Sequence, residues 1–425
     1  MSVRAECVQK LQAILEEGVF FKALKSDFKP QDTAFANFLI LTALRKKANF
    51  DKIIASYLKK NIKHKNRVLK YALLLGVTEI LCAQTPVYAV INEYVGIAKK
   101  LTDKFSGGMV NAVLREVAAK KDLPDISGAF PESFKEILRQ DYNRDEIEKM
   151  EQMLDFEAPV DLSVKENPPL WAEKLNGVLF ENGTVRLHDL KTNLALLEGY
   201  EDGAWWVQDL SASLPVCFLK DIYKKEVLDL CAAPGGKTAQ LLAKGAFVTA
   251  VDVNKQRLSV LEENIARLKM NAHLNVVCAD GEDYLKNTSK NFDVILLDAP
   301  CSATGTFRKH PEVLYLKTKQ DVENQVLIQS ALLDSAAEKL KKNGILMYCT
   351  CSLSKDEGEK QMHSFLAKHP NFTIEEFQMA DLHMYEGQKL DERMVDKKVL
   401  RTLPYDMKNE GGADGFFAVA LKRVK

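Results

Sequence analysis

From Trp206 to the C-terminus, short aliphatic segments alternate with longer segments of helical periodicity. The aliphatic segments are rich in Val, Leu and Ile, as expected for buried strands. Stretches such as "KQRLSVLEENIARLKM" separate them and have the spacing of amphipathic helices. Strands that alternate with helices indicate a doubly wound, parallel α/β sheet. The expected strands are the segments "EVLDLCAA", "FVTAVDV", "LNVVCAD", "FDVILLDAP" and "GILMYCTCS".

The N-terminal third of the chain follows a different pattern. Apolar residues recur at spacings of three and four up to about residue 150, without alternating strands between them, which predicts a helical bundle. Turn signals gather at 121–133, and "EAPVDLSVKENPP" begins a strand-and-turn pattern. We therefore expect three parts: an all-α domain at 1–130, a small α+β linker subdomain at 131–205 and an α/β domain at 206–425.

Composition narrows the class of protein. The 425 residues are 46% hydrophobic, which is typical of a globular chain. Uncharged stretches such as 80–91 are too short to cross a bilayer, and the N-terminus reads as an amphipathic helix and not as a signal peptide. A cytoplasmic protein that does not bind membranes is expected. The eight cysteines include no C-x-x-C pair, so neither a disulfide framework nor a metal site is predicted.

Formal charge is zero overall but is unevenly distributed. Residues 41–121 hold 16 Lys and Arg against 5 Asp and Glu, and many of the cations lie in "RKK" at 45–47 and "KKNIKHKNRVLK" at 59–70. Such a segment could follow the phosphate backbone of a nucleic acid. It is equally compatible with solvated helix faces, so charge alone leaves both interpretations open.

The first expected strand of the α/β region runs into "DLCAAPGGKT". Glycines at a strand-to-helix junction let the backbone approach a ligand, but the pattern is neither G-x-G-x-x-G nor a Walker sequence. An aspartate stands at the end of each of four successive expected strands. Open α/β sheets bind their ligands at this edge, where a carboxylate can accept hydrogen bonds from ribose hydroxyls. Any one acid could instead cap a helix. A nucleoside cofactor without a phosphate cradle points to S-adenosylmethionine. The four acids are Asp229, Asp252, Asp280 and Asp298.

Two cysteines suggest which atom of the substrate receives the methyl group. Carbon 5 of a pyrimidine is a poor nucleophile, but a thiolate that adds to carbon 6 makes carbon 5 enamine-like. After methylation, carbon 5 must lose a proton and the thiol must leave, which requires a second acid or base nearby. Cys301 follows the fourth expected strand and Cys351 ends the next one. Both thiols are therefore expected to reach one cleft.

The motifs "DLCAAPGGKT", "LLDAPCSATG" and "YCTCS" resemble the signatures of the RNA 5-methylcytosine methyltransferases, the Nol1/Nop2/Sun family. The segments "PVYAVINEYVGIAKKL" and "GGMVNAVLREV" resemble the NusB-like helical domain of one bacterial branch of that family. The resemblance implies a NusB-like N-terminal domain and a Rossmann-like, S-adenosylmethionine-dependent methyltransferase domain. It further implies a monomeric enzyme that acts on one cytosine of small-subunit ribosomal RNA, on free 16S rRNA.

The resemblance also assigns roles to individual residues. Cys351, between Thr350 and Ser352, would be the nucleophile, and Cys301 would assist proton removal and product release. Asp298 would contact both cofactor and cytosine. Cys349 stands where the family usually has a small residue, and we interpret it, with Cys231 and Cys278, as a structural thiol. The expected cofactor-binding residues are Cys231, Ala232, Ala233, Pro234, Gly235, Gly236, Lys237, Asp252, Asp280 and Asp298.

Other functions compete with this interpretation. The same chemistry could serve a transfer RNA or large-subunit ribosomal RNA, and a NusB-like half could belong to a non-catalytic RNA-binding factor. An amino-group methyltransferase also places an acid and a proline after its fourth strand, but it needs no nucleophilic cysteine. A dehydrogenase would need the dinucleotide fingerprint, which is missing. Cys301 and Cys351 favour the cytosine methyltransferase.

Overall fold

A computed structural model describes residues 2–22, 28–58, 62–103, 105–120, 125–188, 190 and 192–425. Parts of the expected basic segment (59–61) and of the expected turn region (121–124) lie outside the described residues. The chain divides into two compact units. One comprises Met1–Phe156 and Phe307–Thr318, and the other comprises Glu157–Thr306 and Lys319–Lys425.

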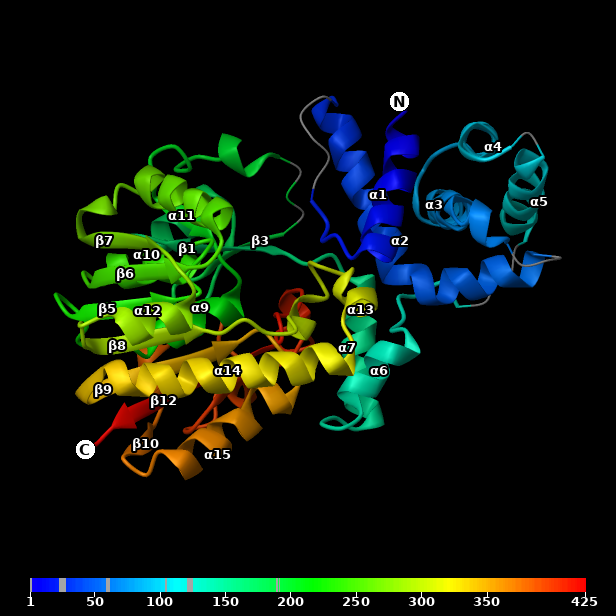
Figure 1. Cartoon of the computed structure of the whole chain (residues 1–425). Coiled ribbons are helices and arrows are strands. Elements are labelled where there is room, and N and C mark those ends of the chain that lie inside the picture. The colour runs from blue at the N-terminus through cyan, green and yellow to red at the C-terminus, as the bar shows by residue number, and fades with distance from the viewer. Residues whose placement is uncertain are drawn as a thin grey trace. The chain divides into compact units, whose positions relative to one another are not determined.

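The first unit is helical, as the sequence predicts. Its central helix, α3, is mostly apolar and mostly buried, and it contacts α1, α2, α4 and α5 (Figure 1). Apolar residues of all five helices form one buried cluster. The helices are α1 (Val3–Glu17), α2 (Pro30–Tyr57), α3 (Val68–Cys82), α4 (Val87–Leu101), α5 (Ser106–Ala119), α6 (Glu132–Leu138), α7 (Arg144–Gln152) and α13 (Val313–Leu316), with short 3-10 turns η1 (His64–Asn66) and η2 (Met153–Asp155).

The segment Phe307–Thr318 belongs to this helical unit although it lies far along the chain. Phe307 is fully buried and packs edge-on against Phe130, with ring centroids 4.9 Å apart. The Tyr315 hydroxyl donates a hydrogen bond to the Leu44 carbonyl, 2.9 Å away. The sequence patterns do not indicate that this segment packs with the helical unit.

The second unit begins with a small antiparallel sheet in the order β2-β3-β1-β4. The buried guanidinium of Arg186 forms a two-pronged ion pair with Asp161, which joins β3 to β1. Asp161 also accepts a hydrogen bond from the backbone of Leu210 at the start of helix α9 (Leu210–Cys217). The elements are β1 (Val160–Val164), α8 (Pro168–Lys174), β2 (Val178–Leu179), β3 (Val185–Leu187), η3 (Leu194–Leu196) and β4 (Trp205–Val207).

The main sheet has eight strands, seven of them in the order β10-β12-β9-β8-β5-β6-β7, while β11 pairs with β12. Strands β5 to β9 are parallel, as predicted, and are the five predicted segments. The prediction of a wholly parallel sheet is wrong at one side, because β12 runs antiparallel to its neighbours. The strands are β5 (Glu226–Leu230), β6 (Phe247–Asp252), β7 (Leu274–Cys278), β8 (Phe292–Asp298), β9 (Leu340–Thr350), β10 (Phe372–Glu375), β11 (Leu400–Thr402) and β12 (Phe416–Arg423).

Helices cover both faces of this sheet. One apolar cluster joins α9, α10 and α11 to one face, and a second joins α12, α14 and α15 to the other. In Figure 1, α14 runs along the strands with α15 beside it. No described helix is both long and apolar enough to cross a membrane. The helices are α9 (Leu210–Cys217), α10 (Gly236–Ala243), α11 (Lys255–Arg267), α12 (Gly281–Asn287), α14 (Lys319–Lys339) and α15 (Glu359–Lys368), with 3-10 turns η4 (Asn271–His273), η5 (Thr304–Thr306), η6 (Lys355–Glu357), η7 (Met379–Asp381), η8 (Glu392–Met394) and η9 (Lys408–Glu410).

Candidate active site

The loop between β5 and α10 contains most of the expected cofactor-binding residues. Gly235 has φ +101°, and a Cβ there would lie 2.8 Å from Cγ of Leu261 on α11, so glycine permits both the turn and the close packing. The Ala233 amide donates to Oδ2 of Asp252, 3.2 Å away, which ties the loop to the end of β6. The loop is thereby held in one conformation against its neighbouring strand.

A pocket of about 510 Å³ opens beside this loop. The Lys237 ammonium lies 2.8 Å from Oδ2 of Asp298, at the end of β8, and both residues line the pocket. Burial lowers the pKa of Lys237, but the neighbouring carboxylate outweighs it and holds that pKa above its ordinary value. The pocket therefore contains an ion pair between these two side chains. Its other lining residues include Trp206, Gln208, Asp229 and Ala232–Gly236.

Asp229 of β5 is a buried acid at the edge of this pocket. Oδ2 accepts a hydrogen bond from the Thr238 hydroxyl at 2.6 Å, whereas Oδ1 is buried without a hydrogen-bond partner among the described residues. Burial, with the nearby Asp298 carboxylate, raises the pKa of Asp229 to about 7, while the bond from Thr238 opposes the shift.

The two other expected acids occupy different surroundings. Asp252 is buried at the end of β6, and it accepts hydrogen bonds from the backbone of Ala233 and Asn254. Asp280 is the N-cap of α12, where its side chain accepts from the amides of Glu282 and Asp283. Neither acid is among the described residues that line the 510 Å³ pocket. Asp280 therefore caps a helix, which is the alternative role that the sequence left open for each of the four acids.

The two expected catalytic cysteines are adjacent in the structure. Sγ of Cys301 lies 3.3 Å from Sγ of Cys351, although 50 residues separate them. Two backbone hydrogen bonds join the loops that carry them, from Ala299 to Cys349 and from Gly305 to Cys351, at 2.9 and 3.0 Å. Because β8 and β9 are parallel neighbours in the sheet, both loops leave it at the same edge.

The environments of the cysteines differ. The hydrogen bond with Cys351, followed by burial, raises the pKa of Cys301 well above its usual range, so this thiol stays protonated at neutral pH. Cys349 is fully buried in the core, and burial raises its pKa as well. Cys231 is half-buried, with a pKa raised to about 12 by burial. The expectation of a packed structural thiol is wrong for Cys278, because it is exposed at the end of β7, one residue before the sheet gives way to a loop.

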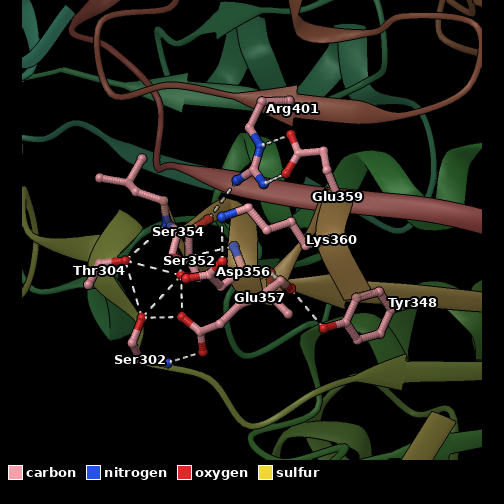
Figure 2. Close-up of polar contacts among 12 residues, drawn as sticks. Ser302, Thr304, Tyr348, Ser352, Ser354, Asp356, Glu357, Glu359, Lys360 and Arg401 are labelled. Carbon is pink, nitrogen blue, oxygen red and sulfur yellow. Dashed lines mark hydrogen bonds and ion pairs between the residues drawn. The ribbon is translucent and has the colours of Figure 1, made fainter. Parts of the chain in front are cut away.

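A buried polar cluster that the sequence patterns do not indicate lies directly behind the two thiols. Ser302 and Ser352, which follow the two cysteines, both donate to the carboxylate of Glu357 (Figure 2). The signal in the sequence is the repeated Cys-Ser pair, followed closely by "KDEGE". The periodicity of the sequence does not predict that Glu357, one of the acids in this segment, is fully buried.

Comparisons with known proteins identify the family of the chain. Residues 216–422 match the model of the family described as 16S rRNA methyltransferase RsmB/F, and residues 1–119 match the NusB family. Ribosomal RNA small subunit methyltransferase B of Cronobacter sakazakii is 30% identical over 410 residues, which cover 88% of this chain and 92% of the relative. The chain belongs to the ribosomal RNA small subunit methyltransferase B family. The protein of that name from Proteus mirabilis is 29% identical and covers 93% of this chain and 99% of the relative.

Solved structures show the same fold. The crystal structure of PH0851 aligns with a TM-score of 0.77 at 20% identity, covering 99% of each chain. NSun6 from Pyrococcus horikoshii, solved with SFG, aligns with a TM-score of 0.57 at 21% identity, covering 70% of this chain and 99% of that one. The expected combination of a NusB domain with a Rossmann-like methyltransferase fold is confirmed.

As a member of the ribosomal RNA small subunit methyltransferase B family, the chain is an S-adenosylmethionine-dependent methyltransferase. The site suits that cofactor. The unpartnered Oδ1 of Asp229, which lines the pocket, can accept a hydrogen bond from a cationic amine. Val253, directly after Asp252, exposes 69% of its surface and offers an apolar face to a flat ring.

Proposed function

We propose that this enzyme methylates carbon 5 of one cytosine in 16S rRNA through a covalent bond between Cys351 and carbon 6. The observation that carries the proposal is the 3.3 Å separation of the Cys301 and Cys351 sulfurs beside the Lys237–Asp298 pair. Methylation of an exocyclic amine needs no nucleophilic thiol, whereas methylation at carbon 5 needs both a nucleophile and a group for release.

The first step joins the enzyme to the base. Sγ of Cys351 forms a bond to carbon 6, and the electron pair of the 5,6 double bond makes carbon 5 nucleophilic. A proton on N3 lowers the cost of this addition, and Asp298, at the end of β8, would hold that edge of the ring. Lys237, 2.8 Å from Asp298, keeps the carboxylate oriented and adds positive charge where electron density accumulates.

The second step restores the aromatic ring. When bound, S-adenosylmethionine would supply an electrophilic methyl group, and the bond from carbon 5 to the methyl would form as the sulfonium–methyl bond breaks and leaves a neutral thioether. The proton on carbon 5 must then leave, and its electron pair re-forms the double bond as the Sγ–carbon 6 bond breaks. Cys301, a protonated thiol adjacent to Cys351, would give its proton to the departing Cys351 sulfur, and the thiolate so formed would take up the proton from carbon 5.

The remaining assigned residues would hold the cofactor. The loop Cys231–Lys237 would surround its methionine part, Asp252 would bind the ribose hydroxyls, and Asp280 would lie near the adenine. The helical unit would bind phosphates through its basic residues, and the target base would leave its stack to enter the site. The substrate would be free 16S rRNA in the cytoplasm, and the enzyme would act as a monomer.

A mapping experiment tests this function. Purified enzyme is incubated with 16S rRNA transcript and S-adenosylmethionine carrying a tritiated methyl group, and the RNA is then mapped by bisulfite sequencing. The expected result is incorporation of label together with one cytosine that resists bisulfite. Label without any resistant cytosine would contradict methylation at carbon 5. Preferential labelling of transfer RNA or large-subunit rRNA would contradict the proposed substrate.

A further inference from the structure

The carboxylate of Glu357 is buried at the end of the turn η6, six residues after Cys351 in the chain. Oε1 accepts hydrogen bonds from the Ser302 amide at 2.8 Å and from Nε2 of Gln329 at 3.0 Å. Oε2 accepts from the hydroxyls of Ser302 and Ser352, each at 2.5 Å. Figure 2 shows this carboxylate reaching toward the two serines. Four neutral donors thus converge on one buried side chain.

The two serines are the residues that immediately follow the two reactive thiols. Their hydroxyl oxygens lie 3.1 Å apart, and each is 3.2 Å from Oγ1 of Thr304. Thr304 also accepts a hydrogen bond from the Leu353 amide at 2.9 Å. Glu357 therefore links the loop after β8 to the loop after β9 at the residues next to the sulfurs.

The position of Glu357 is itself fixed by the sheet and by α14. Its backbone carbonyl accepts hydrogen bonds from the Tyr348 hydroxyl at 2.7 Å and from the Thr350 hydroxyl at 3.3 Å. Gln329 of α14 contacts the carboxylate and also donates to the Pro300 carbonyl at 2.9 Å. Because these anchors belong to regular elements, the carboxylate can act as a rigid reference for both loops.

A buried carboxylate is costly unless its lone pairs are satisfied, and here each oxygen has two donors. No apolar or cationic side chain of similar size could accept these bonds. A glutamine would replace one oxygen with an amide nitrogen that donates and cannot accept, so either the Ser302 amide and Gln329 would lose their acceptor or both serine hydroxyls would have to reorient.

We propose that Glu357 is a positioning residue that holds Cys301 and Cys351 within reach of each other. The roles of the two thiols in this inference rest on the proposed function, but the spacing itself does not. No hydrogen bond joins Glu357 to either thiol among the described contacts, so it holds them in place through Ser302 and Ser352, while its charge also helps to raise the pKa of Cys301.

The test uses the full-length enzyme with three single substitutions. Glu357→Gln removes acceptors without changing the size of the side chain, and Ser352→Ala removes one donor while leaving the carboxylate in place. Asp356→Asn is the matched control, because this neighbouring acid pairs with Lys360 at the surface, 2.6 Å away. Melting temperatures establish which variants fold.

The first measurement needs no RNA. A diazene oxidant such as diamide takes up two electrons and two protons from the thiols of Cys301 and Cys351, giving a hydrazine and a disulfide, and peptide mass spectrometry follows its rate. The rate should fall about tenfold in Glu357→Gln and less in Ser352→Ala, since loss of buried hydrogen bonds displaces the loops. It should be unchanged in Asp356→Asn. A wild-type rate in folded Glu357→Gln would overturn the proposal, and if that variant does not fold, a wild-type rate in Ser352→Ala would overturn it.

The second measurement uses turnover. A folded Glu357→Gln enzyme should lose about tenfold or more in kcat while KM for RNA and for S-adenosylmethionine stays within about twofold, since misplacement of reacting groups affects the chemical step. Equal loss in Asp356→Asn would show a general charge effect and overturn the assignment. If wild-type enzyme shows no transfer to carbon 5, the proposed function fails, while the diamide rates still decide the role of Glu357.

Discussion

At the scale of single residues, the motifs pointed to the two cysteines that we propose as catalytic but not to their arrangement. "DAPCS" and "TCS" mark Cys301 and Cys351 in the sequence, yet their 3.3 Å separation depends on the register of β8 against β9, where Asp298 pairs with Cys349. Register depends on the cores on both faces of the sheet, which no local motif encodes. For the same reason, the burial of Glu357 could not be predicted from its neighbours.

Cys351→Ala is expected to abolish methyl transfer and leave cofactor binding close to that of the wild type, because the thiol acts on the base. Calorimetry with S-adenosylmethionine and a tritium-transfer assay on the same preparation measure both properties. Cys349→Ala is the control, since that thiol is buried in the core and should contribute only packing. Activity retained in Cys351→Ala, or lost only in Cys349→Ala, would contradict the assignment.

The raised pKa of Asp229 predicts a specific pH dependence of the stability of the protein. This pKa is about 7 in the folded chain against an ordinary value of 3.8, so between these values the folded protein holds a proton that the unfolded chain has released. This residue therefore makes stability fall as pH rises from about 4 to about 7, by up to about 1.4 kcal/mol per pH unit. Asp229→Asn should raise the melting temperature relative to wild type at pH 8 but not at pH 4. An equal effect at both pH values would show that Asp229 does not titrate in this range.

At the scale of elements, the sequence predicted β5 to β9 because each is a short aliphatic run followed by a helix. It did not predict the antiparallel strand β12, although this strand pairs with β9 beside the site. An antiparallel strand needs no helical crossover before it. The segment from Glu376 to Gly415, which precedes β12, contains only short 3-10 turns and β11, so the alternation that revealed the other strands is missing.

The small sheet of the second unit depends on the buried ion pair between Arg186 of β3 and Asp161 of β1. Arg186 also donates to the carbonyls of Glu410 and Gly412, so it ties the sheet to the loop before β12. Arg186→Ala should lower the free energy of unfolding by about 3 to 5 kcal/mol, because it leaves a buried carboxylate unpaired. Lys174→Ala, which breaks the exposed pair with Glu198, should cost less than about 1 kcal/mol. Denaturant unfolding measures both, and similar costs would contradict this account.

At the scale of the whole molecule, the helical and α/β character of the two main parts could be read from periodicity, whereas the membership of Phe307–Thr318 could not. That segment follows the Cys301 loop in the chain but packs with the helical unit through Phe307 and Tyr315. Sequence patterns assign neighbouring residues to the same domain. A segment whose core lies elsewhere is visible only from tertiary contacts.

The basic segment of the helical unit predicts a salt effect on RNA binding. Lys63, Lys65, Arg67 and Lys70 are exposed. Replacing all four with Ala should weaken binding of 16S rRNA and reduce the slope of log affinity against log salt by up to about 0.7 to 0.9 for each phosphate that the variant no longer neutralises. Cofactor affinity should not change. An unchanged slope in filter binding would show that these residues form a solvated surface and do not bind phosphates.

The covalent mechanism is tested most directly by trapping the enzyme on its RNA. Cys301→Ala keeps the nucleophile Cys351 but removes the adjacent thiol that should assist release, so the methylated base stays attached through carbon 6. Labelled 16S rRNA incubated with this variant and S-adenosylmethionine should give a retarded band on a denaturing gel. The double variant Cys301→Ala, Cys351→Ala should give none. Normal turnover by Cys301→Ala, or a retarded band that persists without Cys351, would contradict the mechanism.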